Sequence, residues 1–229
     1  MQKFDVNQIK EDDILEGKML LVDKPLTWTS FDVVKYIRKS LVSKFKIKRI
    51  KVGHAGTLDP LATGLLIICI GRQTKQISIY QNLTKTYTGK FKLGETTPSY
   101  DAETEVNKTF NYDHIKENDI INLSQKFTGK LMQKPPIFSA LKKNGKRMYE
   151  YARENKKIKI QEREINIYEF EIIKFTTPYI EFKITCSKGT YIRSIANDFG
   201  KKLNSGSYLS ELRRINIGEF SVLNALQIE

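Results

Sequence analysis

Apolar residues along the chain follow the period of a β-strand in several segments. A continuous apolar run at 65–70 indicates a buried strand. Residues 85–94 alternate cleanly, so Tyr87, Phe91 and Leu93 should share one buried face. Further segments are apolar or alternate in the same way. The predicted strands cover residues 18–23, 65–70, 85–94, 163–175 and 179–187.

Other segments carry a helical period. Thr29 or Ser30 should cap a helix whose apolar face we predict from Phe31, Val34, Ile37 and Leu41. The same reasoning predicts helices at 74–82 and 113–128, the second ended by Pro135-Pro136, and a short helix around 149–151 after an Asn-Gly turn. Strands interspersed with helices predict the α+β class, and we expect residues 1–229 to form a single domain.

Composition narrows the class of protein. Of 229 residues, 40% are hydrophobic and 28% charged, as in globular proteins. No apolar run approaches the roughly 18–20 residues of a membrane span, and the N-terminus lacks the apolar core of a signal peptide. Cys69 and Cys186 form no C-x-x-C pair, so we expect buried free thiols. A cytoplasmic protein with no membrane partner is the expectation.

The charge balance favours a polyanionic partner. A net charge of +13 and a sequence pI near 9.5 suit nucleic acid. Two alternatives stay open, an anionic membrane and a charge excess that only aids solubility. Residues 44–51 alternate basic and apolar residues, which predicts a half-buried strand or an extended segment whose positive face contacts phosphate, or an edge strand protected by lysines.

The candidate functional residues cluster in the loop 53–64, just before the buried strand. Three glycines permit positive φ, and Pro60 disfavours helical geometry at Asp59. His54 and Asp59 therefore lie five positions apart on a stiff, irregular loop, an arrangement that often holds functional groups. From residue types alone, a structural turn in which Asp59 bonds local amides is the better explanation of the loop.

A second segment, 133–153, interleaves six basic residues with aromatics and favours RNA binding. The alternative is a solvated loop and helix with buried tyrosines.

Read as a string, G-H-A-G-T-L-D-P-L-A-T-G-L-L resembles the catalytic motif of the TruB family of tRNA pseudouridine synthases over fourteen contiguous positions. In that family the aspartate is the essential catalytic residue, which here is Asp59. The resemblance continues in other segments. They are D-K-P…S (Asp23, Lys24, Pro25 and Ser30), the K-x-Y strand (Tyr87), a mobile thumb at about 130–160, C-S-x-G-T-Y-I-R (Arg193) and L-x-x-L-R-R. The loop 93–101 matches more loosely, and we assign it no catalytic role.

The resemblance implies a pseudouridine-synthase fold, a mixed and mostly antiparallel sheet flanked by helices, with the thumb as an RNA-binding insertion. It also implies roles for side chains. Asp59 would be the nucleophile, at C6 of the base or C1′ of the ribose, and Arg193 would form an ion pair with it. Tyr87 would stack on the base and serve as, or position, a general base. His54 would fill the space left by the flipped base.

Further residues are expected at the substrate. Leu65 would keep the pocket dry, and Lys24 would lie near the site. Lys142, Lys146, Arg147 and Arg153 of the thumb would bind RNA. The reaction needs no cofactor, and the sequence offers neither a nucleotide-binding glycine loop nor a cluster of metal ligands.

Within the family, the loop and the thumb resemble the bacterial type, which acts alone on uridine 55 in the tRNA T-loop. We therefore expect the T-arm of tRNA as substrate, no obligate protein partner and a monomer. Bacterial members usually continue into a small C-terminal RNA-binding domain of the PUA or a related type, which is not evident here. The alternatives are a non-catalytic tRNA-binding or remodelling protein on the same fold, and an RNA-guided modifying subunit.

Overall fold

The computed structural model describes residues 2–139, 141–143, 145–154, 156 and 158–228. The chain forms two compact units, one of residues 1–88 and 212–229 and the other of residues 89–211. Two strands, β4 (Lys85–Leu93) and β12 (Ser207–Ile217), contribute residues to both units. The assignment of residues 1–229 to a single domain stays a prediction.

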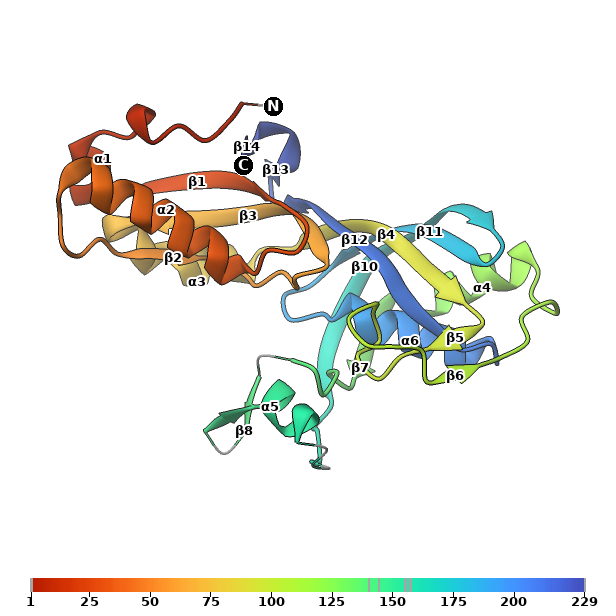
Figure 1. Cartoon of the computed structure of the whole chain (residues 1–229). Coiled ribbons are helices and arrows are strands. Elements are labelled where there is room, and N and C mark those ends of the chain that lie inside the picture. Colours follow the sequence, from red (N-terminus) through yellow and green to blue (C-terminus); the bar gives the residue numbers. More distant parts are fainter. Residues whose placement is uncertain (1, 140, 144, 155, 157, 229) are drawn as a thin grey trace. The chain divides into compact units, whose positions relative to one another are not determined.

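The first unit is built on a short mixed sheet (Figure 1). Its strand order is β14–β1–β3–β12, where β1 (Lys18–Lys24) and β3 (Ala62–Ile70) are antiparallel and their outer neighbours are parallel to them. The other elements are η1 (Val6–Gln8), α1 (Glu11–Leu15), α2 (Ser30–Phe45), β2 (Val52–His54), η2 (Gly71–Gln76), α3 (Ile77–Asn82), β13 (Phe220–Ser221), η3 (Val222–Asn224) and β14 (Leu226–Gln227).

Both faces of this sheet are buried at its centre, which explains the uninterrupted apolar run of β3. One face, with Leu66 and Ile68 of β3, packs against α2. The opposite face, with Leu65 and Ile67, packs against α3 and the segment around Val222. Figure 1 shows α2 lying across β1 and β3. The predicted strand at 65–70 is confirmed, and it begins earlier, at Ala62.

The second unit carries the strand order β12–β4–β11–β10–β7. Its remaining elements are β5 (Glu95–Thr96), β6 (Lys108–Thr109), α4 (Glu117–Lys126), β7 (Gly129–Gln133), β8 (Lys142–Lys143), β9 (Lys146–Arg147), α5 (Met148–Arg153), β10 (Arg163–Thr176), β11 (Tyr179–Cys186) and α6 (Ile192–Lys202). An aromatic cluster forms its core, with the rings of Phe91 and Phe182 4.3 Å apart and those of Phe170 and Phe199 5.5 Å apart.

Two sequence predictions are wrong in detail. Phe31 is 61% exposed, and Val33 takes its place on the buried face of α2. Of the alternatives predicted for residues 44–51, the strand is not formed: α2 continues to Phe45, and residues 46–51 join it to β2 without a regular element. The helix at 113–128 does not run to Pro135, since α4 ends at Lys126 and β7 intervenes.

Candidate active site

Asp59 lies in the loop that joins β2 to β3. These strands pair antiparallel, with His54 opposite Ile68, so residues 55–61 form the connection of a hairpin. Asp59 is half-buried, and its carbonyl accepts a hydrogen bond from the amide of Ala62 at 3.0 Å. The neighbouring Leu58 is 3% exposed and anchors the loop in the core. The aspartate is therefore carried by a backbone fixed on either side.

Arg214 of β12 braces the same loop from inside. Its side chain is only 1% exposed, so the guanidinium must find its partners within the protein. Its Nε donates to the carbonyl of Leu65 at 2.7 Å, and its terminal nitrogens donate to Gly56 at 3.1 Å and Thr57 at 3.5 Å. One planar group thus ties both ends of the loop together, and the sequence analysis did not identify it.

Gly64 permits this approach of β12 to β3. Gly64 pairs with Arg214 in the parallel register and has φ +105°. A Cβ there would lie 2.3 Å from the carbonyl oxygen of Arg214, closer than side chains tolerate. The third glycine of the motif is therefore required by strand packing.

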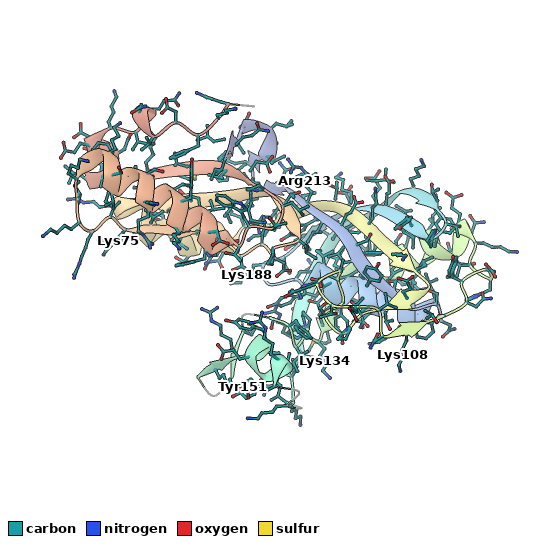
Figure 2. The ribbon with its side chains drawn as sticks, in the orientation of Figure 1. Lys75, Lys108, Lys134, Tyr151, Lys188 and Arg213 are labelled. Atoms are coloured by element: carbon teal, nitrogen blue, oxygen red, sulfur yellow. The ribbon has the colours of Figure 1, made fainter. Side chains whose placement is uncertain are left out.

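The residue before Arg214 in β12 has a different partner. Arg213, labelled in Figure 2, forms an ion pair with Asp23 through two hydrogen bonds at 2.6 and 3.0 Å.

Ser30, at the start of α2, holds the residue before the aspartate. Its hydroxyl accepts a hydrogen bond from the amide of Leu58 at 2.8 Å and donates to the carbonyl of Leu58 at 3.3 Å. Thr27 adds a backbone bond to Pro60 at 2.9 Å. The D-K-P…S segment thus fixes the loop on both sides of Asp59.

Lys24 is fully buried beside this loop. Its Nζ donates to the carbonyls of Pro25 at 2.8 Å, Trp28 at 2.5 Å and Pro60 at 3.3 Å. Burial lowers its pKa to about 8, and the nearby Asp59 carboxylate opposes this shift. The ammonium therefore contributes positive charge next to Asp59 while its hydrogen bonds organise the loop backbone.

His54, at the entrance of the loop, is half-buried. Burial lowers its pKa, and the positive charge of Arg214 lowers it further. Its Nδ1 is buried without a hydrogen-bond partner among the residues that the structure describes. The imidazole is thus neutral at pH 7.

Leu65 and Tyr87 also lie in the first unit. Leu65 is fully buried in the core that contains Ala55 and Ile67. Tyr87, on β4, is 8% exposed and belongs to the predicted buried face, together with Phe91 and Leu93. Among the sequence-predicted residues, Lys24, His54, Asp59, Leu65 and Tyr87 therefore belong to the first unit.

Arg193 belongs to the second unit, where it is buried in the first turn of α6. It is 3% exposed, which excludes a helix-surface charge. Its Nε lies 3.5 Å from a carboxylate oxygen of Asp101, and a terminal nitrogen donates to the carbonyl of Ser99 at 3.3 Å. The loop 93–101, to which the sequence analysis gave no catalytic role, therefore holds a residue predicted to be catalytic.

The predicted thumb residues lie on a small hairpin and the helix that follows it. Lys146 pairs with Glu154 and lies 5.2 Å from the ring centroid of Tyr151, which Figure 2 labels. Arg153 lies 5.4 Å from the ring of Tyr149, and Arg147 is exposed. Lys142 belongs to β8, but its side chain is outside the described set, as are residues Ala140, Asn144 and Asn155 of the motif.

Within the described residues, no helix is long and apolar enough to cross a bilayer. No group of three or more His, Cys, Asp or Glu side chains in this part of the chain is arranged to hold a metal ion.

Residues 42–192 match the model of a family described as TruB family pseudouridylate synthase (N terminal domain). Three curated relatives carry the name tRNA pseudouridine synthase B. The protein from Flavobacterium johnsoniae is 54% identical over 95% of each chain. That from Parabacteroides distasonis is 47% identical over 92% of this chain and 89% of its own, and that from Chloroherpeton thalassium is 50% identical over 92% and 87%.

Solved structures match the fold. A chain in the crystal structure of a Cbf5-Nop10-Gar1 complex superposes with a TM-score of 0.70 at 25% identity over 95% of this chain and 54% of its own. A chain in the structure of an H/ACA RNP bound to a substrate RNA containing 2′-deoxyuridine gives a TM-score of 0.68 at 24% identity over 95% and 52%. The present chain spans about half the length of these two. The predicted α+β fold class is confirmed.

Proposed function

The chain belongs to the TruB family of pseudouridylate synthases, and we propose that it converts uridine 55 in the T-loop of tRNAs to pseudouridine with Asp59 as its nucleophile. The observation that carries the assignment of Asp59 is the construction of its loop. Arg214, Ser30 and Lys24 satisfy the backbone around it from inside the protein, while the aspartate itself is half-buried. A nucleophile held in one orientation reacts faster than a mobile one.

The reaction breaks the N1–C1′ bond of uridine, rotates the uracil and forms a C5–C1′ bond. The proton on C5 leaves to solvent, and N1 takes up a proton, so the product is an isomer of the substrate. The uridine must first be flipped out of its stack, at a cost of a few kcal/mol. Asp59 attacks either C6 or C1′ and is later released, so it is regenerated at the end of each cycle. No electrons are exchanged with another molecule.

Four other side chains complete the proposed site. Arg193 pairs with the Asp59 carboxylate and keeps it ionised. Tyr87 stacks on the flipped base and removes, or positions the group that removes, the proton from C5. His54, neutral at pH 7, fills the space that the base leaves. Leu65 belongs to the apolar wall behind the loop.

Recognition of the T-arm is assigned to the thumb. Lys142, Lys146, Arg147 and Arg153 supply its positive charge, and the aromatic partners of Lys146 and Arg153 hold those two side chains over a ring. A charged side chain held in this way loses less entropy when it meets a phosphate. We further propose that the protein acts as a monomer in the cytoplasm, without a protein partner.

Tritium release from an unmodified tRNA carrying C5-tritiated uridine tests the proposal. Wild-type protein should release tritium from a single T-loop uridine, while Asp59→Asn should bind the same tRNA with unchanged affinity and release none. Release by both proteins would refute the role of Asp59. Binding without release by either would favour the alternative of a non-catalytic tRNA-binding protein.

A further inference from the structure

The acid-free stretch of the chain that holds the most lysines and arginines lies outside the proposed catalytic residues. Between Asp32 and Asp59 the sequence contains eight lysines and arginines and no acidic residue. Seven of these side chains are exposed, and one of the seven, Lys44, donates to backbone carbonyls of residues 6–9. The other six lie on α2 and on the segment that follows it. We call them the basic face: Lys35, Lys39, Lys46, Lys48, Arg49 and Lys51.

The apolar residues between these cations are anchored in the core, which leaves the basic face turned to solvent. Phe45, Ile47, Ile50 and Val52 alternate with its cations and pack against the core under α2. The carbonyl of Lys51 accepts a hydrogen bond from the amide of Gly71 at 2.9 Å, which fixes the end of the segment. The extended segment therefore presents its charges on a backbone that is already ordered, and binding a polyanion would cost little further entropy.

Acidic residues form few contacts with this face. Asp32 interacts electrostatically with Lys35 from one turn earlier in α2. The acids of residues 1–17 are Asp5, Glu11, Asp12, Asp13 and Glu16, and Asp13 pairs with Lys18 at 2.8 Å. Among the described residues, no ion pair joins any of these acids to the six cations. Two more exposed cations, Arg72 and Lys75 of η2, lie beyond Gly71, and Figure 2 labels Lys75.

The basic face begins beside the proposed catalytic loop and extends away from it. Ser30, at the first turn of α2, touches Leu58, and Lys35 follows about one turn later. With 16 residues, α2 is about 24 Å long, so Lys46 and Lys48 lie far beyond the reach of one flipped nucleotide. A ligand that covers the whole face must present negative charge over that distance.

We propose that the basic face binds the phosphate backbone of tRNA outside the T-arm, and so extends the substrate contact of the proposed function. A membrane suits the face less well, because a helix lying in a bilayer needs an apolar side turned to lipid. The apolar side of α2, with Val33, Ile37 and Leu41, is buried in the core. Phosphate contacts need only positioned cations.

The test neutralises three residues of the face by the triple substitution Lys46→Gln, Lys48→Gln and Arg49→Gln. The matched control carries Lys108→Gln, Lys126→Gln and Lys174→Gln, which remove the same charge from exposed positions in the second unit. Dissociation constants are measured against salt for two RNAs, an unmodified full-length tRNA and its isolated T-arm hairpin.

We expect the basic-face variant to bind full-length tRNA roughly tenfold more weakly at 0.1 M salt, with a plot of log K against log salt shallower by about two. Its affinity for the hairpin and its rate of tritium release from the hairpin should match the wild type. The control variant should bind both RNAs like the wild type.

Three outcomes would overturn the proposal. These are wild-type binding of tRNA by the basic-face variant, equal losses for tRNA and hairpin, and an equal loss in the control variant. Binding of anionic phosphatidylserine vesicles that depends on the face, with tRNA affinity unchanged, would assign it to a membrane instead. Failure of the proposed function is distinguishable from failure of this proposal, because wild-type protein would then release no tritium from either RNA.

Discussion

Arg193 and Asp101 form a buried ion pair that joins the first turn of α6 to a loop about ninety residues earlier in the chain. The Arg193 Nε lies 3.5 Å from Oδ2 of Asp101, and the two side chains are 4% and 6% exposed. The other carboxylate oxygen accepts the amide of Glu103 at 3.0 Å. Because both oxygens have partners, the carboxylate is fixed and can orient the guanidinium. Asp101 therefore acts as a positioning residue for Arg193.

Replacing Asp101 by Asn leaves Arg193 buried beside a neutral group. We expect the free energy of unfolding to fall by about 1–3 kcal/mol, because Arg193 stays buried and loses its ion pair with Asp101. We also expect tritium release to slow at least tenfold. Urea unfolding and release kinetics measure the two effects. Glu171→Gln, which breaks an exposed pair with Lys183, should cost under about 1 kcal/mol, and a similar loss there would argue against the importance of burial.

Replacing Arg214 by Lys removes the planar group that ties the loop together. A lysine carries all its donors on one nitrogen and cannot span the separated carbonyls that the guanidinium joins, so Asp59 should lose its fixed orientation. We expect kcat to fall by about 100-fold and KM for tRNA to stay within about twofold, because a small misplacement of a reacting group is costly.

The control for Arg214 is its neighbour. Arg213→Lys keeps a charge next to Asp23 and leaves the loop bonds intact, so its kcat should stay close to wild type. Hydrogen exchange at the amides of residues 56–58 should accelerate in Arg214→Lys and not in Arg213→Lys. Unchanged exchange together with unchanged kcat would show that the loop keeps its geometry without Arg214.

The buried ammonium of Lys24 makes the free energy of unfolding depend on pH in the alkaline range. Its pKa is lowered to about 8 in the folded protein, so between about pH 8 and pH 10.5 the unfolded chain binds more protons than the native one. The stability of the wild type relative to Lys24→Met should therefore rise across this window, by up to about 3 kcal/mol. Urea unfolding at pH 7.5, 9 and 10.5 measures the difference. Lys35→Met, which removes an exposed lysine, should show no such trend.

His54 lowers the stability of the folded protein at acidic pH. Burial and Arg214 lower its pKa in the native state, so below about pH 6.5 the unfolded chain takes up a proton that the native chain resists. Stability is therefore lost as the pH falls, and His54→Gln should be less sensitive to acid than the wild type. Unfolding at pH 7 and pH 5.5 tests this. His114→Gln, at an exposed histidine, should keep the wild-type sensitivity.

Much of the fold follows from local pattern, since the strands at 65–70 and 85–94 and the capped helix after Thr29 are where the sequence predicts them. The errors have a common cause. Phe31 has a helical spacing that fits the buried face, but it lies in the first turn, beyond the edge of the core. Alternation in 44–51 resembles a strand because apolar side chains anchor an extended segment that has no strand partner.

Residues of the candidate site could be proposed from the sequence only where a motif is contiguous. Asp59 stands out because glycines and a proline surround it, and Arg193 because of the string before α6. The roles of Arg214 and Asp101 depend on strand pairing and on a loop that folds onto α6, neither of which spacing reveals. The double arginine at the end of an apolar strand was the available signal, since a buried strand rarely carries an arginine without a partner.

The hydrogen bonds from Arg214 to the Asp59 loop can form only late in the synthesis of the chain. Arg214 follows Asp59 by 155 positions in the chain. At a translation rate of about 5–20 residues per second, the ribosome makes the loop roughly 10–30 seconds before it makes the arginine that holds it. The hairpin of β2 and β3 therefore emerges without its brace. A nascent chain would acquire activity late, when the strand that carries Arg214 reaches its place beside β3.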